Sequence, residues 1–282
     1  MGKPMSLNVL KHGYPLTVTY HRNREPAVEL GRQGAQVADS AAEVAALSDI
    51  VITMLPADKE IFEVYTSPDG LIAHLAEGAV CIDMTSAKPQ TMKELEARCL
   101  EKGIGLLDAP VSGGMAKAVS GELTIMAGGE KDLFERHRAI LETMGTRIYY
   151  TGEAGSGKAI KMINQLINAG NTYIAAEALY LAERLELDME LFYQVVSESS
   201  GGSYVFDNAV KQAMIPRSFD TGFKLDLMKK DFALSMAQAG DDGISLPVLE
   251  QIFRMYEKTS EQGHGSRHYA VVSEQVRQQN EA

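Results

Sequence analysis

One stretch of the sequence places a lysine among amide side chains at helical spacing. Lys161, Asn164, Gln165, Asn168 and Asn171 are three or four residues apart, so on a helix they would share one face. A lysine held beside amides in a cleft, with few carboxylates near it, can donate a proton to a reacting oxygen. The alternative is an ordinary solvent-exposed helix face, and both interpretations fit this segment.

The helix that would carry this face is long and begins after glycines. Gly155 and Gly157 allow a tight turn, and the sequence from Lys158 to Arg184 contains no proline and a single glycine, Gly170. Apolar residues recur on the other side of it, at Ile160, Ile163, Ile167, Ile174 and Ala178. The pattern predicts one helix over residues 158–184.

Two loops that follow apolar segments carry groups suited to ligand binding. Asp83 is followed by two hydroxyls, of which Ser86 could contact a ligand or simply cap the next helix. Ser112-Gly113-Gly114 offers backbone N–H groups beside a hydroxyl, which suits a carboxylate or another anion, although a plain glycine-rich turn is the alternative. Such loops are where α/β sheets bind their ligands.

A later segment, residues 222–231, combines an apolar helix pattern with basic and acidic side chains. Phe223, Lys230 and Asp231 belong to it. Charged residues at helical spacing can line a binding site, but they are also typical of a solvated helix face. The segment therefore gains meaning only in combination with the others.

Strand and helix patterns alternate through the first half of the chain. β-branched and apolar runs predict strands at residues 16–20, 35–37, 49–55, 78–83, 104–108, 123–127 and 147–150. Helix patterns lie between them, at residues 1–11, 29–33, 40–47, 88–102 and 132–144. This alternation predicts an α/β fold, a Rossmann-like, doubly wound sheet with parallel strands.

Strand patterns disappear after residue 158. Helices are expected at residues 158–184, 188–199, 203–214, 227–239 and 247–262, and the polar tail after Ser273 is expected to fray. We therefore expect two domains, an α/β domain over residues 1–152 and an all-helical domain over residues 153–282. The helical half has more apolar faces than one layer can bury, which predicts a homo-oligomer, a dimer or a tetramer.

Composition excludes several classes of function. The net charge is −11, from 27 basic and 38 acidic residues, and no basic block occurs, so a nucleic-acid partner is not expected. No signal peptide and no apolar run of membrane length is present, so no membrane association is expected. The two cysteines, Cys81 and Cys99, are too few for a disulfide framework and fit a cytoplasmic protein. The six histidines form no ligand cluster, and no metal is expected.

Taken in order, these motifs resemble the β-hydroxyacid dehydrogenase family, which includes 3-hydroxyisobutyrate dehydrogenase, tartronate semialdehyde reductase and 2-(hydroxymethyl)glutarate dehydrogenase. The matching segments are Asp49-Ile-Val-Ile-Thr-Met-Leu-Pro56, Asp83-Met-Thr-Ser86, Asp108-Ala-Pro-Val-Ser-Gly-Gly114, Gly121-Glu-Leu-Thr-Ile-Met-Ala-Gly-Gly129, Gly155-x-Gly-x-x-x-Lys161-x-x-Asn164 and Gly222-Phe-x-x-x-Leu-x-x-Lys-Asp231. They cover nearly the whole chain, and their combination is highly specific. The resemblance implies an NAD(P)-binding domain followed by a helical domain for substrate binding and oligomerisation.

The resemblance also implies roles for individual residues. Lys161 matches the catalytic lysine, which gives a proton to the carbonyl oxygen in reduction and takes it from the hydroxyl in oxidation. Asn164 would orient that lysine and the substrate hydroxyl, and Gln165 would line the same pocket. The loop for the substrate carboxylate would be Ser112, Gly113 and Gly114. The cofactor would be contacted by Leu55, Pro56, Ser86, Phe223, Lys230 and Asp231.

The N-terminus departs from the family pattern. The family opens with a strand and Gly-x-Gly-x-x-Gly, of which only the third glycine has a counterpart here, Gly2. We expect that the recorded start lies downstream of the real one or that the chain is a truncated product. Poor cofactor binding and low stability are the expected consequences, because the missing glycines approach the pyrophosphate and the missing strand is central.

Two further departures concern selectivity. His21-Arg22-Asn23-Arg24 occupies the place where NAD-binding sheets usually carry an acid for the ribose 2′-hydroxyl. A cation such as Arg22 suits a 2′-phosphate, so the expected cofactor is NADP or NAD, with a preference for NADP. Arg267-His268 stands where the family commonly has an acid, which leaves the recognition of the far end of the substrate open.

The sequence thus predicts an oxidoreductase that transfers a hydride between NAD(P) and a short 3-hydroxy acid or its semialdehyde. An alternative is a truncated or decayed dehydrogenase fold that serves as a non-catalytic binding or scaffold protein. A third, an imine reductase, is disfavoured because Lys161 is present. The particular hydroxy acid is not defined by the sequence.

Overall fold

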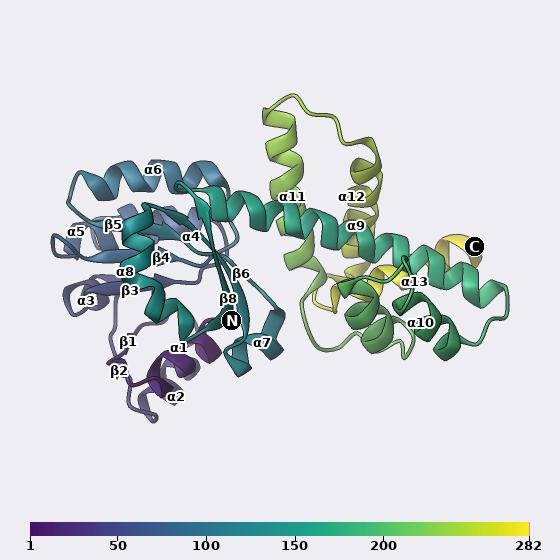
Figure 1. Ribbon diagram of the computed structural model, residues 1–282, viewed down its shortest axis with the longest axis horizontal. Coiled ribbons are helices and arrows are strands. Elements are labelled where there is room, and N and C mark those ends of the chain that lie inside the picture. The colour runs from purple at the N-terminus through teal and green to yellow at the C-terminus, as the bar shows by residue number, and fades with distance from the viewer. Residues whose placement is uncertain (282) are drawn as a thin grey trace. The chain divides into compact units, whose positions relative to one another are not determined.

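The computed structural model describes residues 1–281, and the chain folds into two compact units (Figure 1). The first unit is Met1–Lys161 and the second begins at Met162. Helix α9 (Ser156–Arg184) starts in the first unit and continues into the second. The long helix predicted over residues 158–184 is thereby confirmed, with a start two residues earlier.

Strands and helices alternate through the first unit, as the sequence patterns predict. Its elements are α1 (Gly2–Lys11), β1 (Thr17–Val18), α2 (Glu25–Gly31), β2 (Gln36–Val37), α3 (Ala41–Ala46), β3 (Ile50–Thr53), α4 (Asp58–Thr66), α5 (Leu71–His74), β4 (Val80–Asp83), α6 (Pro89–Leu100), β5 (Gly105–Asp108), β6 (Val111–Ser112), α7 (Gly114–Ser120), β7 (Leu123–Gly129), α8 (Lys131–Glu142) and β8 (Gly145–Gly152). β1 and β2 pair with each other in a small parallel sheet, and the remaining strands form a six-stranded one. The α/β class is confirmed, whereas β6 and α7 were not predicted.

The six-stranded sheet is mixed, which corrects the expectation of a wholly parallel one. β3, β4 and β5 are parallel, but β7 runs antiparallel to both β5 and β6 and parallel to β8. β5 and β6 pair with the same edge of β7, one after the other. Pro110 separates them, because it has no N–H to donate to a neighbouring strand. Only ten residues connect β6 to β7, and this short return suits an antiparallel pair.

β4 is buried on both faces, as a continuous apolar strand in the middle of a sheet should be. Val80 and Ile82 belong to a core cluster shared with α1, α7 and α8. Cys81 points to the opposite cluster, which includes side chains of α3, α4, α5 and α6. Because a fully buried apolar side chain contributes roughly 1.5–3 kcal/mol, this alternation fixes the register of the strand.

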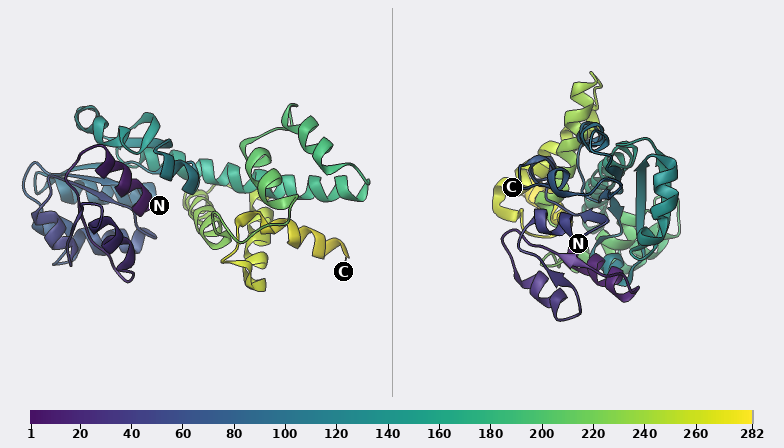
Figure 2. Two further views of the ribbon diagram at one scale, coloured as in Figure 1. Left: turned by 90° about the horizontal axis from the view of Figure 1, so that it is seen from below. Right: turned by 90° about the vertical axis from the view of Figure 1, so that its left-hand side faces the viewer.

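The second unit is helical, and its described residues form no strand beyond one bridge between Lys224 and His268. After α9 come α10 (Met189–Ser197), η1 (Phe206–Met214), α11 (Leu225–Asp241), α12 (Pro247–Thr259), η2 (Ser260–His264), η3 (Tyr269–Val271) and α13 (Val272–Glu281). These helices gather around the part of α9 that follows Met162 (Figures 1 and 2). Their shared core contains Leu179, Phe206, Phe232 and Tyr256.

Two segments of this unit differ in detail from the sequence patterns. The helix predicted over residues 203–214 is present but is a π-helix from Phe206, and Ile215 N–H donates to the Val210 carbonyl five residues earlier. The tail after Ser273 is ordered as α13 instead of frayed. Val272 and Val276 are four residues apart and buried in the core, so two apolar side chains are enough to anchor a helix of otherwise polar composition.

His268 joins the loop before α13 to the start of α11. Its Nδ1 accepts a hydrogen bond from Ala270 N–H at 3.2 Å and so caps η3, and its backbone pairs with Lys224. Burial lowers the pKa of the His268 imidazole from 6.5 to about 4. A proton on Nδ1 would remove the capping acceptor, so the folded chain favours the neutral ring.

His268 should make stability depend on pH between about 4 and 6.5. The pKa is lower in the folded chain, so the unfolded chain takes up the proton first and stability falls as the pH drops through this window. Between pH 7 and about pH 4.5, we expect wild type to lose about 1–2 kcal/mol more than His268→Asn, which keeps a capping acceptor without titrating. Urea unfolding at both pH values measures the difference, and equal losses would contradict this account.

Candidate active site

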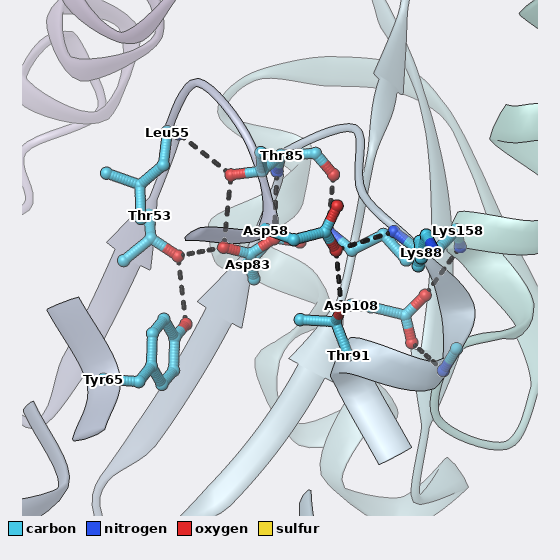
Figure 3. Close-up of polar contacts among 11 residues, drawn as sticks. Thr53, Leu55, Asp58, Tyr65, Asp83, Thr85, Lys88, Thr91, Asp108 and Lys158 are labelled. Carbon is cyan, nitrogen blue, oxygen red and sulfur yellow. Dashed lines mark hydrogen bonds and ion pairs between the residues drawn. The ribbon is translucent and has the colours of Figure 1, made fainter. Parts of the chain in front are cut away.

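The carboxyl end of β4 is organised by the buried carboxylate of Asp83. Its Oδ2 accepts hydrogen bonds from Thr53 Oγ1 at 2.6 Å and Thr85 Oγ1 at 3.2 Å, and its Oδ1 accepts one from Thr85 N–H at 3.1 Å (Figure 3). The Tyr65 hydroxyl donates to Thr53 Oγ1 at 3.0 Å, since the Thr53 proton is already used. Thr85 Oγ1 accepts from Leu55 N–H at 2.9 Å. One carboxylate therefore joins the loops that follow β3 and β4.

The Lys158 ammonium binds the same carboxylate from the first turn of α9. The side chains of Lys158 and Asp83 are both inaccessible to solvent and form an ion pair. Lys158 Nζ also donates to the backbone carbonyls of Asp83 at 3.0 Å and Thr85 at 2.5 Å (Figure 3). The three protons of the ammonium thus have three acceptors.

Sequence reasoning missed Lys158. A lysine near the start of a helix is usually exposed, so its residue type gave no reason to place it inside the protein. The sequence did contain an indication of a buried cation. Asp83 and Asp108 both end buried strands, and two adjacent buried carboxylates require a cation or several hydrogen-bond donors nearby.

Asp108, at the end of β5, caps the start of α9. Its Oδ1 accepts from Gly155 N–H at 2.7 Å and its Oδ2 accepts from Lys158 N–H at 2.8 Å. Burial raises the pKa of the Asp108 carboxyl, and the Lys158 ammonium and the two N–H donors offset part of that rise. These bonds satisfy two N–H groups that the first turn of a helix leaves without partners.

Two glycines let α9 approach the sheet this closely. Gly155 has φ +90°, and a Cβ there would lie 2.7 Å from the Pro89 carbonyl oxygen. At Gly157 a Cβ would lie 2.2 Å from the Met126 carbonyl oxygen and 2.7 Å from Asp108 Oδ2. Any larger residue at position 157 would push the helix away from β7 and from its capping carboxylate.

The lysine and amide face of α9 is turned inward, and the isoleucine face is turned outward. Lys161 is 7% exposed and Gln165 is 4% exposed. On the other side Ile163 and Ile167 are 53% and 55% exposed. The interpretation of the lysine face as an ordinary solvated surface is therefore wrong for Lys161 and Gln165.

Four of the predicted site residues form one polar chain. Asn164 Nδ2 donates to Gln165 Oε1 at 3.2 Å, and Gln165 Nε2 donates to Asp231 Oδ2 at 2.9 Å. The Lys230 ammonium pairs with Asp231 Oδ1 at 3.0 Å. Asp231 is buried, so the amides of α9 are held in a fixed orientation by a charged group on α11.

The loop Ser112-Gly113-Gly114 joins β6 to α7. Gly113 and Gly114 have φ values of +130° and +69°, which only glycine adopts readily. A Cβ at Gly113 would also lie 2.7 Å from Cδ of Lys117, whose aliphatic stem covers this turn. The turn itself requires both glycines, and their N–H groups remain suited to an anion.

Leu55, Pro56 and Ser86 follow the carboxyl ends of β3 and β4, which are adjacent parallel strands. Ser86 does not cap α6, because the residue before the first turn of that helix is Lys88. Asp58 Oδ1 accepts instead from Lys88 N–H at 2.9 Å and Thr91 Oγ1 at 2.5 Å (Figure 3). The helix-cap alternative for Ser86 is thereby excluded.

The first turn of α1 fits an anionic group such as a pyrophosphate. It contains no acidic residue and no side-chain cap, so the N–H groups of Gly2 and Lys3 can serve a ligand, while Pro4 has none. A Cβ at Gly2 would meet no atom within 4 Å, so packing gives no reason for glycine at this position.

Arg22 is exposed in the turn after β1, and neighbouring Arg24 lies over the Tyr20 ring at 5.4 Å. Gly2 and Arg22 lie outside the network drawn in Figure 3.

Phe223 and the Arg267-His268 segment are brought together at the start of α11. The Phe223 carbonyl accepts from Tyr269 N–H at 2.9 Å, and the two rings meet edge to face. The Arg267 guanidinium lies over the Phe219 ring at 5.2 Å. The basic pair found where an acid is common thus packs against aromatic residues, and its loop lies beside the loop that contains Phe223.

A Rossmann-like sheet with polar loops at the ends of its parallel strands, followed by a helical unit, defines a class of nicotinamide-dependent oxidoreductases. Residues 1–152 match the family described as the NAD binding domain of 6-phosphogluconate dehydrogenase. Residues 155–274 match the family described as the NAD-binding part of NADP-dependent 3-hydroxyisobutyrate dehydrogenase.

Individual relatives agree with these matches over the whole chain. The 2-(hydroxymethyl)glutarate dehydrogenase of Eubacterium barkeri is 33% identical, over 96% of this chain and 90% of that protein. The mitochondrial 3-hydroxyisobutyrate dehydrogenase of Mus musculus is 36% identical, over 99% of this chain and 85% of that protein. The structure of 3-hydroxyisobutyrate dehydrogenase from Mycobacterium tuberculosis with L-serine has a TM-score of 0.90 at 29% identity, over 98% of this chain and 96% of that one.

The chain belongs to the β-hydroxyacid dehydrogenase family. Its function is that of an NAD(P)-dependent hydroxyacid dehydrogenase, as the sequence predicts. Nothing among the relatives supports the non-catalytic alternative. Imine reductases share the fold, at 19% identity for the one from Myxococcus stipitatus, and that likeness concerns the fold alone.

Among the residues that the structure describes, no helix has the length and apolar character needed to cross a membrane. Across residues 1–281, no group of three or more His, Cys, Asp or Glu side chains is placed so that it could hold a metal ion.

The close approach of α9 to the sheet can be tested with two glycines of the same helix. Gly157→Ala should lower the free energy of unfolding by about 2 kcal/mol or more, because its Cβ has no room beside the Met126 carbonyl. Gly170→Ala is the matched control: its Cβ would lie 3.5 Å from Leu249, and it should be neutral or stabilising by up to about 1 kcal/mol. Chemical denaturation measures both, and equal effects would refute the close approach.

Proposed function

We propose that this chain oxidises short 3-hydroxy acids to their semialdehydes and catalyses the reverse reduction, with Lys161 as the proton carrier. The nicotinamide cofactor accepts or supplies the hydride. In reduction, the Lys161 ammonium gives a proton to the substrate carbonyl oxygen, and in oxidation the amine takes the hydroxyl proton. The observation that carries this proposal is the burial of Lys161 on a helix face whose other polar groups are neutral amides.

Asn164 and Gln165 orient the reacting groups in this proposal. Asn164 is held by its bond to Gln165, and Gln165 by its bond to Asp231. A substrate-orienting amide must keep one orientation through the reaction, and a chain of hydrogen bonds that ends in an ion pair restricts its rotation. Lys230 and Phe223 would contact the cofactor from the same unit.

Ser112, Gly113 and Gly114 bind the substrate carboxylate. The positive φ values of both glycines support this assignment, because they turn successive backbone N–H groups towards one point, a geometry that suits an anion. Leu55, Pro56 and Ser86 would contact the cofactor at the ends of β3 and β4, with Gly2 beside its pyrophosphate.

The substrate class follows from what the named relatives share. 3-Hydroxyisobutyrate, 2-(hydroxymethyl)glutarate and L-serine each carry a hydroxyl on the carbon β to a carboxylate. A carboxylate-binding loop and a proton carrier suit this spacing, so substrates of this chain should share it. Arg267 and His268 would influence which group is accepted at the far end of the acid.

NADP is the proposed preferred cofactor. Arg22 is exposed after β1, and the sequence between Thr19 and Arg24 contains no carboxylate for a ribose 2′-hydroxyl. Arg24 is partly engaged by Asp39, at 3.9 Å, in an exposed pair of the kind that contributes little. Arg22 is therefore the better candidate for the 2′-phosphate.

The two domains, residues 1–152 and 153–282, are assigned to cofactor binding and to substrate binding with self-association. A homo-oligomer is supported by the apolar stripe along α9, where Ile163, Ile167, Ile174 and Leu181 are all more than half exposed. The free thiols of Cys81 and Cys99 are buried, which fits a reducing cytoplasm.

Replacement of the proton carrier tests the proposed reaction. Lys161→Ala should reduce kcat by about 10²- to 10⁴-fold, the usual contribution of general acid–base catalysis, while the protein still binds NADPH. Turnover would be measured with 3-hydroxyisobutyrate, glycerate, L-serine and 2-(hydroxymethyl)glutarate, and binding by nicotinamide fluorescence. The control is Lys102→Ala at an exposed lysine. Retained turnover in Lys161→Ala would remove Lys161 from the mechanism.

Cofactor choice can be tested at Arg22. The ratio of kcat/KM for NADP to that for NAD should fall at least about tenfold in Arg22→Ala, because one charge-assisted contact is worth about 1.5–3 kcal/mol. Arg32→Ala, at another exposed arginine of the same region, should leave the ratio unchanged. A strong preference of wild type for NAD would refute the assignment.

A further inference from the structure

We propose that Lys158 is a positioning residue that locks the turn after β4 to the first turn of α9 and so sets the places of Ser86 and Lys161. This inference rests on the proposed function, in which Ser86 contacts the cofactor and Lys161 carries the proton. Lys158 itself touches neither ligand, since its ammonium is enclosed by residues 83–85.

All three acceptors of the Lys158 ammonium come from one turn of the chain. They are the Asp83 carboxylate, the Asp83 carbonyl and the Thr85 carbonyl. Because a peptide unit is planar and trans, the direction of the Thr85 carbonyl determines the direction of the Ser86 N–H, which points the opposite way. The ammonium therefore fixes the backbone at the residue expected to meet the cofactor.

The same residue fixes the helix that carries Lys161. Lys158 N–H is bound by Asp108 and its side chain by the turn after β4, so this residue is held at both its backbone and its side chain. Lys161 follows three residues later on α9, within one helical turn. A shift of the turn after β4 would therefore be transmitted to Lys161, and a rotation of α9 would be transmitted to Ser86.

Stability alone is a weak explanation for this ion pair. Burial of two charges carries a desolvation cost that their attraction often only matches, and apolar residues of similar size frequently serve the fold as well. The ammonium adds a fixed geometry, because its three hydrogen bonds to residues 83–85 restrict this turn to one backbone conformation. This fixed geometry lies at the edge of the sheet where β3 and β4 end and the loops after them begin.

The test compares Lys158→Met with the double variant Asp83→Asn/Lys158→Met, in the full chain. The single variant leaves Asp83 buried without its cation, and its Tm should fall by about 10 °C. The double variant removes the Asp83 charge together with its cation, while Asp108 keeps its two N–H donors, so it should recover at least half of that loss. Lys93→Met, at an exposed lysine of α6, is the matched control and should behave as wild type.

The positioning role is read from the double variant at a temperature where it is folded. Its Kd for NADPH, from the midpoint of a nicotinamide fluorescence titration, should rise at least fivefold. Its kcat should fall at least 30-fold, while KM for the hydroxy acid stays within threefold because the Ser112 loop is built from other residues. A purely structural role would reduce the amplitude of the titration and leave its midpoint unchanged. A wild-type midpoint and kcat in the folded double variant would overturn the proposal.

The two proposals can fail separately. The midpoint of the NADPH titration needs no turnover, so it reports on Lys158 even if Lys161→Ala were to retain full activity. In that case the proton-carrier assignment would be lost, and a raised Kd in the Lys158 variants would still support the link to the turn after β4. Conversely, an inactive Lys161→Ala together with an unchanged double variant would reject Lys158 alone.

Discussion

The structure depends on how the first turn of α9 is held at the carboxyl edge of the sheet. Asp108 accepts two of the N–H groups that this turn leaves unpaired, and Asp83 balances the charge of Lys158. Without these carboxylates a helix start would be buried beside β7 with unpaired donors and an uncompensated cation, each of which is costly. The strand ends and the helix that carries Lys161 are consequently one polar assembly, closed by residues distant in sequence.

Part of the surface of α9 departs from the usual pattern of a surface helix, although Tyr173 and Leu179 of the same helix are buried in the core. Lys161 and Gln165 are buried, and the isoleucines at positions 163, 167 and 174 are exposed. A helix of a monomeric protein would normally turn those isoleucines inward, because burial of apolar area is the main favourable term in folding. This departure is accounted for if the polar face serves chemistry and the apolar face serves a second copy of the chain, as proposed.

Local patterns were sufficient for the strands and helices whose signal is contained in one segment. β4 and the long α9 were predicted from runs of apolar residues and from the lack of proline. The mixed sheet was not predicted from local patterns. The direction of β7 depends on the chain reversal through α7 and on the break at Pro110, and no single segment of the sequence encodes this combination. Lys158 was missed for the same reason: its burial depends on Asp83, which lies 75 residues earlier. The roles of Lys161 and Ser112, which residue type and spacing suggest and the resemblance makes specific, stay predictions.

The charge distribution raises a problem that the fold addresses locally. The chain has a net charge of −11, yet a nicotinamide dinucleotide and a hydroxy acid are both anions. Two of the buried or half-buried lysines, Lys158 and Lys230, are already paired with Asp83 and Asp231, so they add little positive potential. In the proposed site, backbone N–H groups at the first turn of α1 and at Gly113 and Gly114 would supply it instead, because dipoles attract an anion without adding a charge that must be balanced when no ligand is bound. An acidic protein can therefore bind acidic ligands through peptide groups whose orientation the glycines permit.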